Sequence, residues 1–183
     1  GGDGNFLGLH LHQSEDRRRV ELTVGNGVYD RLAEKLGRWR LKRPPATPTA
    51  PDINDVVREG RRDAEGPEVA CADFDFRAIL GIISFLAHQA VPHLALAVSL
   101  LSTLAARPTR RACLALARVA SYALEHRQPL VFEHTPDLVS LETTVHVDAA
   151  FDDRGNGKST VAFFVQLNGM SVHWGVGQTK RLT

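Results

Sequence analysis

Hydrophobic and polar positions alternate over two short runs near the start of the chain. In residues 6–12 every second position from 7 to 11 is leucine, and residues 19–24 alternate again after the polar stretch 13–18. Alternation places apolar side chains on one face of an extended strand. Two such runs joined by a polar turn predict a β-hairpin.

Apolar positions then recur at helical spacing. Val28, Leu32 and Leu36 lie four residues apart and stop before Gly37, which predicts a short amphipathic helix. Three further helices are expected in the middle of the chain, and they should pack into a compact unit. They run from about Phe74 to His88 with Asp73 as N-cap, from near Pro92, and from Pro108-Thr109 to about His126.

The last third of the chain carries strand and turn patterns. A short strand is expected at residues 129–133, and the Thr/Val-rich residues 141–148 predict another. Residues 159–167 and 170–176 flank an Asn-Gly pair, which favours a tight hairpin turn. We therefore expect a three-stranded antiparallel meander after the helical unit and an α+β fold overall.

Prolines punctuate the region between the first helix and the helical unit. Few apolar residues lie between Pro44 and Pro67. A proline-rich and apolar-poor composition favours an extended, partly disordered chain. We expect residues 44–70 to form a linker.

An uncharged stretch raises the question of a membrane span. Residues 78–106 contain no Asp, Glu, Lys or Arg. This uncharged stretch is long enough to cross a bilayer. His88, Gln89 and His93 place polar groups in its middle, where they are costly, and Pro92 divides it. Two buried helices are expected here, and no membrane is expected as a partner.

Composition and charge narrow the function classes. The 183 residues include 22 Lys+Arg and 21 Asp+Glu, so the net charge of +1 excludes a globally basic coat protein or an acidic tail, but not a local basic face. The two cysteines form no CxxC pair, and the first residues lack the basic and apolar regions of a signal peptide. An intracellular location, cytoplasmic or nuclear, is therefore expected.

Basic side chains gather in two places. The third helix of the helical unit carries more arginines than acidic residues, and a second group surrounds Trp39. Arginine pairs well with phosphate, so both groups are candidates for nucleic-acid contacts, although a solvated helix face or linker edge would have the same composition. The candidates are Arg107, Arg110, Arg111 and Arg118 in the first group and Arg38, Arg40 and Lys42 in the second.

Several short motifs follow one another along the chain. They are Phe6-Leu7-Gly8-Leu9-His10-Leu11 before a hairpin and a helix, residues 76–86 (FRAILGIISFL), and then Val147-Asp148-Ala149, residues 153–160 and Trp174. In order and spacing, this series resembles the polyproteins of copia-type retrotransposons. The first motif resembles the end of the reverse-transcriptase palm, the second a motif of the next helices, and the last group the opening of the ribonuclease H domain.

The resemblance implies a division of the chain into four parts. These are a palm-end hairpin and helix at 1–43, a Pro-rich linker at 44–70, a three-helix thumb and connection unit at 71–127, and a truncated ribonuclease H-like domain at 128–183. It also implies weak binding to an RNA–DNA hybrid or primer–template. The expected partners are this nucleic acid and the rest of the polyprotein.

Asp148 is the catalytic and metal-binding candidate that the resemblance implies. Ribonuclease H chemistry uses several carboxylates to hold two Mg²⁺ ions, which activate water and stabilise the leaving oxygen. Position 150, which is aspartate in the family, is Ala150, and the family's next carboxylate is expected beyond Thr183. We expect Mg²⁺ to act only in a complete polymerase or ribonuclease H, and this chain alone to be inactive. The alternative function is a helical protein-interaction module that does not bind nucleic acid.

Overall fold

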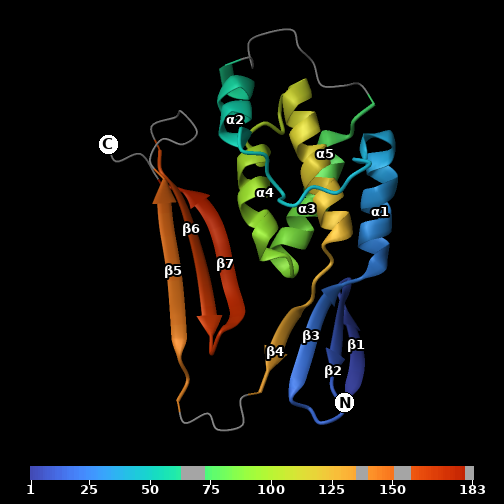
Figure 1. Ribbon diagram of the computed structural model, residues 1–183, viewed down its shortest axis with the longest axis vertical. Coiled ribbons are helices and arrows are strands. Elements are labelled where there is room, and N and C mark those ends of the chain that lie inside the picture. The colour runs from blue at the N-terminus through green and yellow to red at the C-terminus, as the bar shows by residue number, and fades with distance from the viewer. Residues whose placement is uncertain (63–72, 135–139, 151–157, 180–183) are drawn as a thin grey trace.

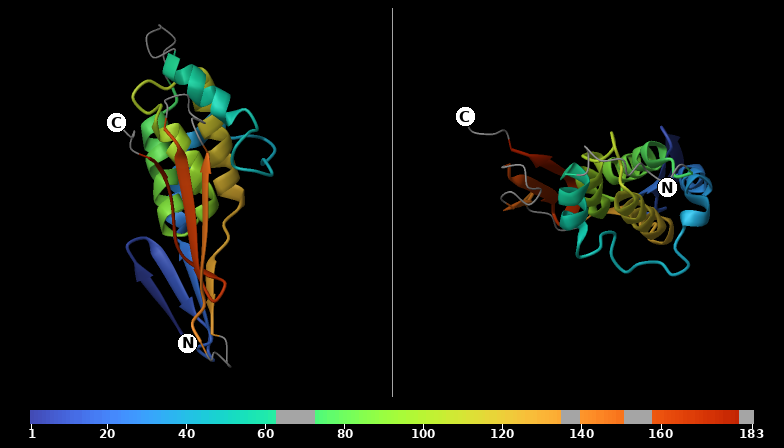
Figure 2. Two further views of the ribbon diagram at one scale, coloured as in Figure 1. Left: turned by 90° about the vertical axis from the view of Figure 1, so that its left-hand side faces the viewer. Right: turned by 90° about the horizontal axis from the view of Figure 1, so that it is seen from above.

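The computed structural model describes residues 1–62, 73–134, 140–150 and 158–179. These residues form five α-helices and two antiparallel sheets, so the expected α+β class is confirmed. One sheet lies at an end of the helical unit and the other runs along its side (Figures 1 and 2). The helical unit therefore contacts both sheets.

The first sheet has four strands in chain order. They are β1 (Gly2–Phe6), β2 (Leu9–Gln13), β3 (Arg19–Val24) and β4 (Leu130–Glu133), each antiparallel to its neighbour. The hairpin predicted from the alternating runs is present as β2 and β3. The strand predicted over residues 6–12 is interrupted, because Leu7 and Gly8 adopt positive φ angles of 49° and 83° and form a tight turn between β1 and β2. Such two-residue turns suit glycine, and they match the twist of paired strands.

Strand β4 joins this first sheet and not the C-terminal one. Val20 lies opposite Phe132, and Leu22 lies opposite Leu130. The strands expected after residue 128 therefore belong to two different sheets. The first of them, β4, pairs with the free edge of β3, and the others form the second sheet. Backbone groups at a strand edge need hydrogen-bond partners, and a short strand returning from the last helix provides them here.

The helices cluster around one core. They are α1 (Asn26–Leu36), α2 (Ile53–Arg62), α3 (Phe76–Gln89), α4 (Ala95–Ser102) and α5 (Arg110–Glu125), with the 3₁₀-helices η1 (Gly37–Trp39) and η3 (Pro92–Leu94). All five α-helices contribute buried apolar side chains to a single cluster, which includes the fully buried Leu32, Ile83 and Cys113. No helix in the described part of the chain is both long and apolar enough to cross a membrane.

The start of α3 differs from the predicted one by two residues. The Asp75 side chain accepts a hydrogen bond of 3.2 Å from the Ala78 backbone N–H, so Asp75 and not Asp73 is the N-cap. Asp73 instead forms an ion pair with Arg38. The helix expected to open at Pro108-Thr109 is α5, and Thr109 is its N-cap, because the Thr109 hydroxyl accepts from the Ala112 N–H.

A helix occupies part of the expected linker. Within 44–70, the structure describes residues up to 62, and ten of them form α2. Ile53, Val56, Val57 and Gly60 are buried on one side of α2, which contacts α4 and α5. This spacing of three and four residues is typical of the buried face of a helix. The proline-rich composition of the segment had instead favoured an extended linker.

The second sheet is the expected meander. Its strands are β5 (Thr143–Ala150), β6 (Thr160–Leu167) and β7 (Met170–Gln178), in the order β5-β6-β7. Asn168 and Gly169 form the turn between β6 and β7 with positive φ angles of 48° and 77°. Strand β7 contacts α4, so the helical unit covers one face of this sheet.

Candidate functional site

Asp148 lies on β5, two residues before the strand ends. It is opposite Ala162 of β6 and on the same face of the sheet as His146, Phe164 and Trp174, since residues two apart share a face. Its side chain is exposed, and one carboxylate oxygen accepts a 2.8 Å hydrogen bond from the Ala149 N–H. The carboxylate is thus held on a sheet face that turns toward the helices.

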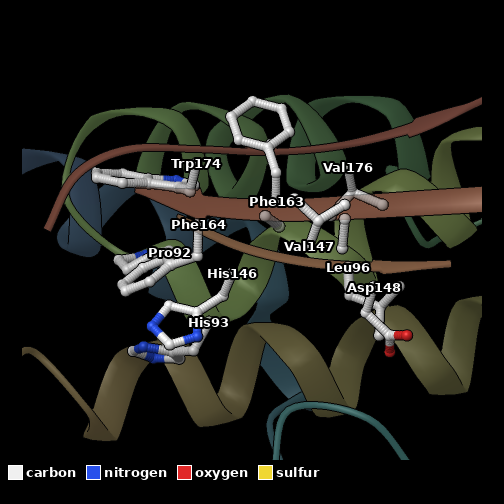
Figure 3. Close-up of a pocket in the computed structure, with 13 residues that line it drawn as sticks. Pro92, His93, Leu96, His146, Val147, Asp148, Phe163, Phe164, Trp174 and Val176 are labelled. Carbon is white, nitrogen blue, oxygen red and sulfur yellow. The ribbon is translucent and has the colours of Figure 1, made fainter. Parts of the chain in front are cut away.

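A cleft of about 310 Å³ separates this sheet face from η3 and α4. The residues that line it from the helical side include Pro92, His93 and Leu96, and those from the sheet include His146, Asp148, Phe164, Trp174 and Val176. Figure 3 shows the His93 and His146 rings close together at one end of the cleft and Asp148 at the other. The cleft is mainly apolar, with two imidazoles and one carboxylate at its margins.

Trp174 anchors the sheet to the helical unit. Its indole N–H donates a hydrogen bond of 2.7 Å to the backbone carbonyl of Ala87 in the last turn of α3. The last carbonyls of a helix have no partner within the helix, so a side-chain donor there satisfies a group that would otherwise need water. The position of the cleft therefore depends on this contact.

His93 is the perturbed group of the cleft. Its ring packs edge-on against Tyr122 of α5, with 5.4 Å between ring centroids, and Tyr122 stacks on His126. Burial of part of the ring, and then the nearby His126, lower the pKa of His93 below its usual 6.5. The neutral imidazole is thus favoured on the helical side of the cleft.

The described residues do not make a magnesium site around Asp148. Among them, no group of three or more His, Cys, Asp or Glu side chains is arranged to hold a metal ion. Asp152 and Asp153, which follow β5, lie outside the described residues. One exposed carboxylate does not offset the charge of two divalent ions.

Two of the predicted basic residues of α5, Arg111 and Arg118, are engaged within the chain. The Arg111 guanidinium donates to Asp52 at 2.8 Å and to Glu59, and these carboxylates raise the pKa of Arg111. Arg118 donates to the Thr47 hydroxyl at 3.3 Å, and its Nε is buried. Asp52, Glu59 and Thr47 all belong to the segment expected to be a linker. That segment covers the side of α5 predicted to face phosphates.

The second basic group is also mostly paired. Arg40 donates to Glu125 at 2.6 Å, and Arg38 pairs with Asp73. The backbone N–H of Leu41 donates to the Ser121 hydroxyl at 3.0 Å. Together with the Thr47 and Asp52 contacts, these bonds lay residues 40–52 along α5 from its C-terminal to its N-terminal end.

Three predicted basic residues remain to be placed. Arg110 is exposed in the first turn of α5, and Lys42 is exposed beside the other end of that helix. Neither has an acidic partner among the described residues. Arg107 precedes α5 and interacts with the rest of the chain. Lys42 and Arg110 are therefore the predicted cations still available to an external anion.

Most residues that line the cleft were not predicted as site residues, and His146, Phe164 and Leu96 are examples. His146, Phe164 and Leu96 come from elements that were predicted, but nothing marked them as neighbours across the sheet and helix boundary. Alternation along β5 could have placed His146 on the face of Asp148. No local sequence pattern predicts that η3 and α4 pack on that face of the sheet.

The chain was compared with known proteins in three ways. It matches no family model, no curated protein and no solved structure.

Proposed function

We propose that this chain is part of a copia-type retroelement polyprotein. It spans the end of the reverse-transcriptase palm, the thumb and connection region, and the first strands of a ribonuclease H domain. Its own function is weak binding to an RNA–DNA hybrid or primer–template, without catalysis by the chain alone. The observation that carries the proposal is the order of elements, in which a hairpin and helix precede a helical unit and then a meander with Asp148 on its first strand.

The cations available for this binding differ from those that sequence alone favours. Arg111 and Arg118 hold the segment that covers α5, so they contribute to its position. Lys42 and Arg110 flank α5 without acidic partners among the residues that the structure describes. Both are exposed, and each can contact a phosphate without losing an ion pair.

Salt-dependent binding tests the proposal. Fluorescence anisotropy with a labelled RNA–DNA hybrid should show an affinity that falls as salt rises, because each phosphate contact releases a counterion. Lys42→Gln with Arg110→Gln should reduce the slope of log affinity against log salt by about 1 to 2. The matched control is Arg17→Gln with Arg18→Gln, which removes the same charge from the turn before β3. Equal slopes in both double variants would contradict the proposed surface.

Cleavage is tested with the same hybrid. With Mg²⁺ present, the parent chain and Asp148→Asn should both leave the RNA strand intact, because one carboxylate cannot hold two ions. Cleavage by the parent that Asp148→Asn abolishes would show that Asp148 is a metal ligand in a working site.

A second function is supported by the ion pairs themselves. Arg38, Arg40 and Arg111 each pair with an acidic side chain of this chain. A surface whose charges are neutralised internally suits a helical protein-interaction module that does not bind nucleic acid. Absence of hybrid binding at low salt would favour this alternative.

A further inference from the structure

The outer edge of β5 pairs with no other strand in the part of the chain that the structure describes. The sheet order places β5 at one edge, paired only with β6 among the described residues, and Figure 1 shows it at the margin of the molecule. Its eight residues are exposed except Thr144, and they include no Pro or Lys, the residues that commonly protect an edge strand. Strand β7, at the opposite edge, lies against β4, where Met170 Sδ accepts from the Glu133 N–H.

The backbone groups that face outward can be identified. The Asn168 N–H donates to the carbonyl of Glu142, so Glu142 directs its backbone groups toward β6. The Thr179 N–H donates to the carbonyl of Ser159. The odd-numbered residues of β6 therefore direct their backbone N–H and C=O groups toward β7, and the even-numbered ones direct them toward β5. Because direction alternates along a strand, Val145, Val147 and Ala149 direct their N–H and C=O groups to the open edge.

These three residues fit an antiparallel strand related by a twofold axis. With the axis at Val147, Val147 lies opposite the partner's Val147, and Val145 lies opposite the partner's Ala149. Each of these pairs can exchange two backbone hydrogen bonds. All the outward groups of Val145, Val147 and Ala149 are then satisfied.

Charge selects this register over its neighbours. With the axis at Val147, His146 lies opposite the partner's Asp148 on both sides of the axis. These pairs are of the type without direct hydrogen bonds, in which facing side chains are closest. An axis at His146 would place two imidazoles opposite each other, and an axis at Asp148 would do the same with two carboxylates.

The exposed side chains also fit a second copy. Val145 and Val147 are 56% and 65% exposed on the sheet face turned away from the helices. Pairing across the axis brings the valines of the two copies together on one continuous face. Opposite-charge and apolar pairs across strands are both stabilising.

We propose that the chain self-associates through β5, forming a six-stranded sheet centred on Val147. One strand pair buries less area than a standard stable interface, so the dissociation constant is expected to exceed about 1 μM. The proposal does not depend on nucleic-acid binding.

Sedimentation equilibrium over micromolar to submillimolar concentrations tests the interface. The parent should show a monomer–dimer equilibrium, and Val147→Lys should weaken it at least about tenfold because two like charges would meet at the axis. The control Val172→Lys changes an exposed valine of β7 and should leave the equilibrium unchanged. A monomeric parent, or equal dimerisation of the two variants, would overturn the proposal.

A charge exchange tests the register. His146→Asp should weaken the dimer, because it places two carboxylates opposite each other. Adding Asp148→Lys should restore the dimer, since opposite charges then face each other, and an unfolded protein could not give this recovery. A double variant as weak as His146→Asp would overturn the register centred on Val147.

Discussion

The guanidinium of Arg111 in α5 lies 2.8 Å from the carboxylate of Asp52, next to the first residue of α2. The same guanidinium also contacts Glu59, about two helical turns further along the chain on the same side of α2. Arg111 therefore connects the longest helix to a segment 59 residues earlier in the chain. Its charge holds α2 in place on the helical unit.

Arg111→Ala is expected to reduce the free energy of unfolding at low salt. It removes two ion pairs in which both partners are about half exposed, and such pairs contribute modestly. The loss should shrink at high salt because the charges are screened. Urea denaturation measures it, with Arg110→Ala as the control, since Arg110 has no acidic partner among the described residues. Equal losses in both variants would contradict the structural role of Arg111.

Asp75→Ala is expected to destabilise the protein by about 1 kcal/mol. The change removes the N-cap of α3 and leaves the Ala78 N–H without its acceptor. Asp73→Ala should cost less than about 0.5 kcal/mol, because it removes only an exposed ion pair with Arg38. Thermal unfolding distinguishes the two, and the reverse ranking would restore Asp73 as the cap.

Trp174→Phe is expected to loosen the second sheet. An aromatic side chain is retained, but without the indole N–H the Ala87 carbonyl loses its donor, a loss of about 1 kcal/mol. Amide hydrogen exchange should accelerate in β6 and β7 more than in α5. Uniform acceleration, or none, would mean that this bond does not hold the sheet to the helices.

Stability is expected to fall as the pH drops below about 6.5. The pKa of His93 is lowered in the folded state, so the unfolded chain binds more protons between the two pKa values. This contribution is present above the unfolded pKa and is lost as the pH falls through the folded one. Because part of the ring is exposed, it should stay below about 1 kcal/mol. Urea denaturation between about pH 5 and pH 8 measures the free energy of unfolding at each pH. This free energy should change less with pH in His93→Gln than in the parent. An unchanged pH dependence would contradict the role of His93.

Local patterns predicted most of the elements. Leu32 and Leu36 marked α1, Thr109 marked the start of α5, and the Asn168-Gly169 turn marked the β6–β7 hairpin. Each of these signals lies within a few residues of the element it specifies. Short-range physics is therefore enough to place them.

The contacts that could not be predicted from the sequence join residues far apart in the chain. The four buried positions of α2 were hidden by the surrounding prolines, and its partners on α5 are about 50 to 60 residues away. Arg111 and Arg118 could equally have faced solvent, phosphate or carboxylate. Only the packed chain shows that Asp52, Glu59 and Thr47 reach them.

The place of β4 in the first sheet has a consequence for the order of folding. Arg19 and Glu133, which form an ion pair across β3 and β4, are 114 residues apart. Closing a loop of that length costs entropy before the strand contacts repay it, so contacts of this separation slow folding. During synthesis, β1 to β3 can pair early as a hairpin ladder, but β3 keeps an open edge until α5 has been made. The N-terminal sheet is therefore complete only after the helices between β3 and β4 have been synthesised.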